Sequence, residues 1–336
     1  MRVRDAIGPG VSSAAVNPPE PAPAPADSTI AGPEVDGDAE ASSGRVHERE
    51  RPTARVDREI PDAPDPRSRY RRALHVGPAL RSLWSSRHIT WSLAWRDLRA
   101  SYSQEILGFS WALIGPIMLM VVLTFLKGAA GATVNTNGVA YPVFLYVGLL
   151  PWSFFTGSVT AGANSLVNNP LLNKVYAPRE VFVLAQIIES AVNTGAAAVA
   201  LVALFVIYGI VPASTSWWAI PLLAILLVFT VGFSIFVAGL TVYLRDLRHA
   251  LPQAIQLGFF VTPIIWSLSG ISAGWQVVVC AINPNAAVID GLRRSVLYGE
   301  TPNLGLTAIA AGVSVLWLVG SFFLFKRLET GFADVS

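Results

Sequence analysis

Six apolar runs, each about as long as a bilayer-crossing helix, follow residue 106 and constrain the fold more than any other feature. A helix crosses the hydrocarbon core with about 20 predominantly apolar residues and satisfies its own backbone groups. We predict spans at residues 107–126, 140–163, 190–211, 217–244, 250–268 and 304–325. Only 14% of all residues are charged, against about 25% in soluble domains. The predicted fold class is therefore an all-α polytopic membrane protein with six transmembrane helices.

Positive charges in the connections predict the orientation of the spans. They follow the second, fourth and sixth spans: Lys174, Arg179, Arg245, Arg248, Lys326 and Arg327. Because Lys and Arg concentrate in cytoplasmic loops, we expect both termini in the cytoplasm. Lys127, at the outer end of the first span, is an exception whose long side chain can reach the interface. Residues 107–325 then form the transmembrane domain, and residues 326–336 form a cytoplasmic tail.

The first 70 residues have the composition of a disordered cytoplasmic tail. They are rich in proline and acidic residues, so they cannot bury enough apolar surface to offset the entropy of ordering. They also lack the apolar core of a signal peptide. A regulatory or docking arm is the alternative interpretation.

Residues 71–106 combine a basic juxtamembrane strip with an amphipathic interface helix. Arginines outnumber acids here, with Asp97 opposing its neighbours Arg96 and Arg99. From residue 88 to 105, apolar and aromatic residues recur at helical spacing, including Trp91 and Trp95. Such a helix lies at the headgroup level of a membrane. The pattern leaves open whether the helix only floats there or also contacts a cytoplasmic partner.

The segment at residues 270–303 predicts re-entrant helices between the fifth and sixth spans. Two apolar pieces, each too short to cross the bilayer, are separated at Asn283 and Pro284. Span parity puts them outside, although the segment carries Asp290, Arg293, Arg294 and Glu300. We expect them to dip into the outer leaflet and return, while interfacial helices lying flat are the alternative.

Several kinds of chemistry are absent from the sequence. No G-x-x-x-x-G-K-[ST] loop is present to hold nucleotide phosphates, and the four histidines have no metal-binding spacing. One cysteine excludes a disulfide framework, and a net charge of +2 does not suggest nucleic acid. Glu189 is placed at the cytoplasmic boundary rather than in a proton relay. We therefore expect that the chain is not an enzyme and binds no metal or cofactor. If it moves a substrate, the energy must come from outside this chain.

Aromatic residues gather in and around the first two spans: Phe109, Trp111, Tyr146, Trp152, Phe154 and Phe155. Aromatic faces suit sugar rings, so these residues are candidates for the lining of a channel. Contact with lipid is the more ordinary role of each one taken alone.

Five motifs together resemble one family. They are LAWRDLRASYSQEILGFSWALIGPIMLM, NNPLLNKVYAPRE, VYLRDLRHALPQAIQ, NPNAAVIDGLRRSVLYGETP and FKRLETGFADV. The combination, spread over residues 89–335, is similar to the permease subunits of type-2 ABC exporters for polysaccharides, the O-antigen and teichoic-acid class. The tail at residues 1–70 has no counterpart in the shorter members.

The resemblance implies a homodimeric permease in the plasma membrane that works with two copies of a cytoplasmic ATPase, on which ATP and Mg are bound. The interface helix would span residues 88–104, and residues 168–178 would form a coupling helix. The implied coupling residues are Asn173, Lys174, Val175, Tyr176, Pro178, Arg179, Arg245 and Asp246. A plain turn is the alternative for this loop. The re-entrant region would include Asn283, Pro284 and Arg293.

The resemblance also implies an undecaprenyl- or decaprenyl-pyrophosphate-linked glycan as substrate, with a cell-wall galactan favoured by the Arg-rich and Ala-rich composition. Arg96 and Arg99 would lie at the entrance and attract the pyrophosphate, because arginine matches phosphate oxygens in bidentate fashion. Contact with the partner or with lipid headgroups is the alternative for both. Two rival functions stay open: a permease for a small drug or lipid, and an integral-membrane glycosyltransferase, for which Asp290 and Glu300 are the only acidic pair outside.

Overall fold

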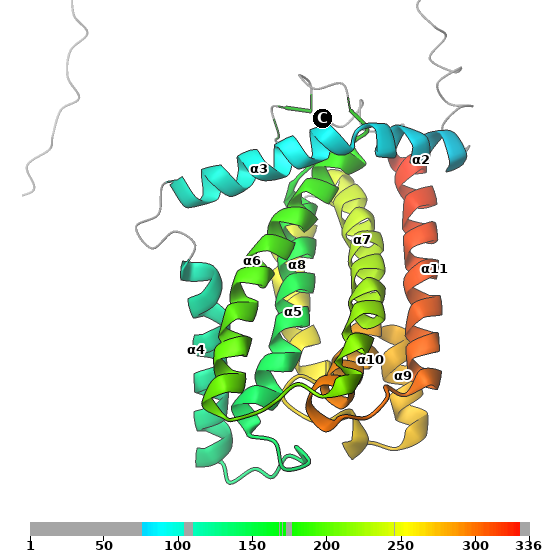
Figure 1. The fold of residues 1–336 in the computed structure, drawn as a ribbon. Helices are drawn as coiled ribbons and strands as arrows, with labels where there is room; N and C mark the ends of the chain where they lie inside the picture. Colours follow the sequence, from blue (N-terminus) through cyan, green and yellow to red (C-terminus); the bar gives the residue numbers. More distant parts are fainter. Residues whose placement is uncertain are drawn as a thin grey trace, which may run out of the picture. The chain divides into compact units, whose positions relative to one another are not determined.

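The described part of the protein, in a computed structural model, covers residues 76–103, 110–167, 169, 171–172, 177–244 and 246–329. Within these residues the regular structure is entirely helical (Figure 1). The helices are α2 (Val76–Ser85), α3 (Arg87–Ser103), α4 (Ser110–Ala129), α5 (Tyr141–Asn164), α6 (Glu180–Ile207), η1 (Ser214–Trp218), α7 (Ala219–Tyr243), α8 (Leu247–Val261), η2 (Leu268–Gly270), α9 (Ala273–Ile282), α10 (Pro284–Leu292), η3 (Arg293–Tyr298) and α11 (Leu304–Glu329). The all-α polytopic fold class is therefore confirmed. The predicted tail at residues 1–70 lies outside the described residues.

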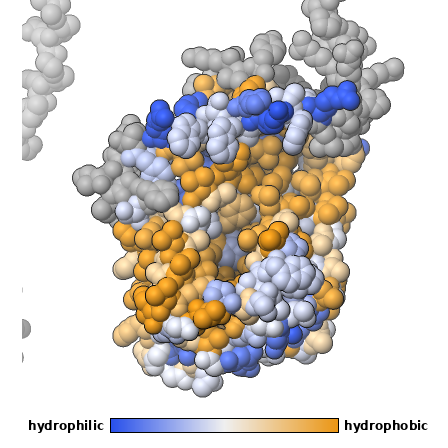
Figure 2. All heavy atoms as spheres, viewed as in Figure 1, coloured by the Kyte–Doolittle hydropathy of each residue, from blue (hydrophilic) through white to orange (hydrophobic). Residues whose placement is uncertain are grey.

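Five helices among the described residues are long and apolar enough to cross a membrane: α4, α5, α6, α7 and α11. Figure 2 shows the apolar surface that such a bundle presents to lipid, a band of hydrophobic atoms between two more hydrophilic ends. One end carries α3 and the other carries α10 (Figure 1). We call them the α3 end and the α10 end.

The predicted fifth span differs from the other five. Here α8 has only 15 residues and ends at Val261, after which the chain turns through Thr262 and Pro263. Proline has no backbone N–H to continue a helix, so it favours this break. The number of six spans therefore stays a prediction.

At the centre of the bundle is α5, which packs against α4, α6, α7, α8 and α10. Most of α5 is buried, whereas α4 is almost entirely unburied. The hydroxyl group of Tyr146, which is fully buried, donates to the carbonyl of Ala197 on α6 at 2.9 Å. Such a partner is what a buried phenol requires.

The crossing of α7 and α11 depends on a glycine. A Cβ atom at Gly232 would lie 2.7 Å from the backbone nitrogen of Leu318 on α11. Small residues at such crossings let two helical backbones approach closely in a membrane. The packing of α7 against α11 is the most extensive between two helices of the described part.

Candidate functional site

The interface helix predicted at residues 88–104 is present as α3, which lies across one end of the bundle along α6 (Figure 1). Its inner face is apolar, with Leu93, Ala94 and Leu98 buried. This buried apolar face agrees with the helical spacing of apolar residues in the sequence.

Polar contacts join the inner side of α3 to α6. Gln186 Nε2 donates to Asp97 Oδ2 at 2.8 Å, and Ser101 Oγ donates to Glu189 Oε1 at 2.9 Å. One turn further, the Tyr102 hydroxyl contacts Asn193 Oδ1. Glu189 therefore lies level with α3, at the end of the apolar band. Because residues 186, 189 and 193 share one face of α6, α3 is held to that helix over two turns.

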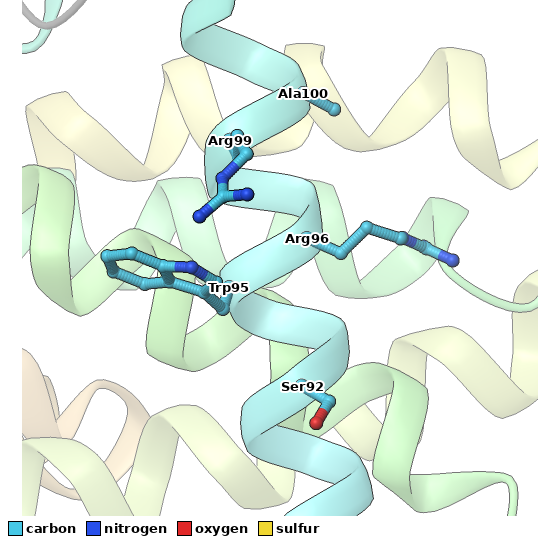
Figure 3. Close-up of a pocket in the computed structure, with 5 residues that line it drawn as sticks. All are labelled: Ser92, Trp95, Arg96, Arg99 and Ala100. Carbon is cyan, nitrogen blue, oxygen red and sulfur yellow. The ribbon is translucent and has the colours of Figure 1, made fainter.

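The outer face of α3 is aromatic and cationic. Trp91 and Trp95 are exposed on it, as is Trp84 on the preceding α2. Figure 3 shows Trp95, Arg96 and Arg99 around a shallow cavity of about 450 Å³, whose lining is completed by Ser92 and Ala100. Tryptophan and arginine are residue types enriched in protein–protein interfaces.

The two arginines predicted to hold pyrophosphate point apart in Figure 3. Arg96 Nε donates to Asp97 Oδ1 at 2.9 Å. The guanidinium carbon of Arg99 lies 5.9 Å from the centroid of the Trp95 ring. In this conformation the two cations do not converge on one anion.

The predicted coupling residues are described only in part. Asn173, Lys174, Val175, Tyr176 and Arg245 lie outside the described residues. Pro178 and Arg179 immediately precede α6, and their carbonyls accept hydrogen bonds from Val181 and Phe182. Asp246 is exposed and immediately precedes α8.

An ion pair that the sequence analysis missed lies next to these residues. Lys326 Nζ, near the end of α11, lies 2.6 Å from Glu180 Oε1 and 2.9 Å from Glu329 Oε2. The Glu180 side chain is fully buried. Lys326 belongs to α11, which continues to Glu329 beyond the predicted end of the span at residue 325. The pair links the start of α6, which follows the predicted coupling loop, to the last helix.

The predicted break at residues 283–285 is confirmed, because α9 ends at Ile282 and α10 begins at Pro284. Asn283 Oδ1 accepts from the backbone of Asn285, which caps α10. Its Nδ2 donates to Thr262 Oγ1 at 2.7 Å. Asn283 therefore joins α10 to the turn that follows α8.

Arg293, predicted only as a member of the re-entrant region, closes the broken end of α8. Its guanidinium donates to the carbonyls of Pro263 and Ile264 at 2.6 Å each, of Phe144 at 3.1 Å and of Trp266 at 3.2 Å. Carbonyls beyond a helix end have no partner within the helix. Arg293 supplies donors to the carbonyls of Pro263, Ile264 and Trp266, which follow the end of α8, whereas Phe144 lies within α5.

A glycine on α5 makes room for this guanidinium. A Cβ atom at Gly148 would lie 2.7 Å from Arg293 Nη2 and 3.3 Å from Ile289 Cγ2. The guanidinium carbon also lies 3.6 Å from the centroid of the Phe144 ring. The site needs both the small residue and the aromatic face.

The aromatic residues predicted to line a channel occupy the core instead. Tyr146, Trp152, Phe154 and Phe155 are each at most 7% exposed. Phe155, for example, stacks on Phe229 of α7 with centroids 5.3 Å apart. The reason is that α5 is enclosed by other helices, so its aromatics face neighbours rather than open space. Phe109 and the Trp111 side chain lie outside the described part.

The sequence matches the ABC-2 type transporter family over residues 88–297, more than half of the chain. It is 29% identical to the O-antigen export system permease protein RfbA of Myxococcus xanthus over 257 residues, which cover 74% of this chain and 96% of the relative. It is also 29% identical to a Klebsiella pneumoniae protein of the same description over 243 residues, which cover 71% and 92%. The matched residues include α3, the helices at the centre of the bundle and the Arg293 site. The chain therefore belongs to the ABC-2 type transporter family.

Proposed function

We propose that this chain is the membrane-spanning permease subunit of an ATP-driven exporter that moves polysaccharide across the plasma membrane. The observation that carries the proposal is the alignment to O-antigen export permeases over 96% and 92% of their lengths. A match of that extent covers nearly the whole of each relative and not one shared motif. Neither a small-molecule permease nor a glycosyltransferase is favoured by a comparable observation.

The energy comes from a separate subunit, since the sequence has no phosphate-binding loop. In this proposal two ATPase copies, with ATP and Mg bound on them, act on a permease homodimer whose termini are cytoplasmic. The exposed aromatic and cationic face of α3 supports a partner at that end. Such a face also suits a membrane surface.

Coupling runs through two connections at the α3 end. A push on α3 reaches α6 through the contacts of Asp97, Ser101 and Tyr102. A push on the loop before α6 reaches α11 through Glu180 and Lys326. Each connection joins two helices by polar contacts, so a displacement of one helix is transmitted to the other.

The cargo in this proposal is an undecaprenyl- or decaprenyl-pyrophosphate-linked glycan, of the cell-wall galactan type. The main role of Arg96 and Arg99 in this proposal is to bind the partner subunit, because their guanidinium groups diverge and do not surround one anion. A role toward pyrophosphate requires both to turn to one side of α3.

The test is export by the purified permease together with the ATPase that co-purifies with it. Reconstituted in vesicles, the pair should move lipid-linked glycan across the bilayer, and the glycan should stimulate ATP hydrolysis. Stimulation by small hydrophobic drugs but not by glycan would replace polysaccharide export with drug export. Glycan extension without ATP would indicate a glycosyltransferase.

A further inference from the structure

A polar cleft lies between α4, α5 and α6, within the part of the protein that presents an apolar surface. Its volume is about 260 Å³, slightly below the roughly 300 Å³ at which ligand pockets begin. The residues that line it are Ala112, Pro116, Ser153, Thr156, Gly157, Ser190, Asn193, Thr194 and Ala197. Its size suits the headgroup of a ligand rather than a whole glycan.

The lining supplies hydrogen bonds without charge. Ser153, Ser190 and Thr194 carry hydroxyl groups, which can donate and accept. The Thr156 hydroxyl donates to the Ser153 carbonyl at 3.2 Å and keeps its capacity to accept, and the Asn193 amide keeps its N–H donors. Pro116 adds an acceptor, because a proline in a helix leaves the carbonyl four residues earlier, here that of Ala112, without its usual donor. No Asp, Glu, Lys or Arg is among the nine lining residues.

This chemistry selects among ligands. An anionic phosphate would need a cation or several backbone N–H groups, and a lipid tail would gain nothing from five polar side chains. A sugar ring presents hydroxyl groups that both donate and accept, so it can satisfy each lining group without charge. Polar groups in a membrane are costly when they lack partners, so such a lining favours a polar occupant.

The position of the cleft connects it to α3. Asn193 accepts a hydrogen bond from Tyr102 of that helix, which orients the Asn193 side chain at the cleft. One wall is α4, which is barely buried in the bundle and lies beside α6 (Figure 1). The α4 wall is therefore the least buried of the three helices around the cleft.

We propose that this cleft binds the neutral, polyhydroxyl headgroup of a membrane-embedded glycolipid, one sugar ring at a time. Only the identity of the natural ligand, the lipid-linked glycan, rests on the proposed function. Small polar residues also serve helix–helix packing, but helices that packed fully at these positions would leave no space of this volume. A second copy of the chain seated on α4 would be the main alternative occupant.

The experiment measures access to a cysteine placed in the cleft. The single native Cys280 is replaced by serine, and Thr194→Cys is introduced into the full-length chain in phosphatidylcholine vesicles. Maleimide labelling is followed with dodecyl maltoside or dodecylphosphocholine added below the concentration that dissolves the vesicles. The two probes share a tail and differ only in the headgroup. With dodecyl maltoside at about twice its Kd, roughly one third of the cleft would be empty, so labelling should slow roughly threefold. Dodecylphosphocholine should leave the labelling rate unchanged.

Matched variants decide what the protection means. Val199→Cys, on the lipid-exposed side of α6, should label at the same rate with either probe. Ser190→Ala should weaken the protection by maltoside, and Ser153→Cys replaces Thr194→Cys if that variant does not fold. Equal protection by both probes would indicate a tail site and overturn the proposal. No labelling without any probe would indicate cover by a second copy and overturn it as well. If maltoside does not change the labelling rate, the cleft does not bind a sugar headgroup, and the proposal is overturned.

Because this assay needs no transport, its failure is distinct from a failure of the proposed function. In the export assay, Gly157→Val narrows the cleft, since a Cβ atom there already lies 3.4 Å from Ser190 Oγ. We expect it to lower glycan export while ATPase binding is kept. Full export by this variant, in a system where the wild type exports glycan, would contradict the role of the cleft and leave the exporter assignment intact.

Discussion

Arginine serves opposite purposes at the two ends of the bundle. At the α10 end, Arg293 is 2% exposed and donates to four backbone carbonyls. At the α3 end, the Arg96 side chain is 48% exposed and pairs with the adjacent Asp97. A buried charge must satisfy every donor locally, while an exposed one is free to bind something else. The comparison separates arginines that hold this fold together from arginines available to a partner.

The largest effect is expected for Arg293→Met. The substitution orphans up to three carbonyls, those of Pro263, Ile264 and Trp266, each costing about 1–3 kcal/mol, so the free energy of unfolding should fall by at least about 3 kcal/mol. Thermal unfolding of the detergent-solubilised protein measures the change. Arg294→Met is the matched control, because Arg294 is partly exposed and pairs with Glu300 at 2.9 Å. Equal losses in both variants would remove the distinction between the two types of site.

Lys326→Met tests the cation that pairs with the buried Glu180, and its effect should rank next. It leaves the buried Glu180 carboxylate without its cation, which costs about 3 kcal/mol when one partner of a buried pair is removed. Glu180→Gln should cost clearly less, because Lys326 keeps Glu329 at 2.9 Å. The unfolding temperatures of the two variants are measured, and Lys326→Met should unfold at the lower temperature. A larger loss for Glu180→Gln would show that the glutamate has a role beyond this pair.

Gly148→Ala sharpens the comparison by crowding Arg293 without removing it. The new methyl group would meet Arg293 Nη2 at 2.7 Å, and such overpacking costs about 1–3 kcal/mol. Gly312→Ala on α11 is the control, since nothing lies within 4 Å of its added Cβ. In an Arg293→Met background the cost of Gly148→Ala should shrink, as expected for coupled neighbours. Additive losses would mean that the glycine is needed for another reason.

The two ends also differ in how far the sequence predicted them. The helical spacing of Trp91 and Trp95 was enough to predict α3, and Asn283 with Pro284 predicted the start of α10. These are local signals, set by periodicity and capping. The inward turn of Arg293 depends on carbonyls near residues 144 and 264, which no local pattern reports. Pro263 was the available signal, because a proline near the end of a span implies carbonyls that need donors elsewhere.

The aromatics of α5 illustrate the same limit. Tyr146, Trp152, Phe154 and Phe155 lie in the core because of where α5 sits among its neighbours, and their spacing alone does not report that position. A span that is apolar on all sides suits either the centre of a bundle or the lipid. Only the packing of α4, α6, α7 and α8 around α5 decides between the two.

The smallest effect on stability, and the most informative for function, is expected for Arg96→Ala combined with Arg99→Ala. Exposed side chains usually change the free energy of unfolding by no more than about 0.5 kcal/mol, so the double variant should melt like the wild type. Its binding to the ATPase subunit, measured by co-purification, should nevertheless weaken, because the outer face of α3 loses both cations. The control is Arg81→Ala on α2, an exposed arginine away from the cavity of Figure 3. If the double variant binds the ATPase normally but loses glycan-stimulated ATP hydrolysis, the arginines face the pyrophosphate and not the partner. If it instead unfolds as readily as Arg293→Met, exposure does not separate the two ends of the bundle.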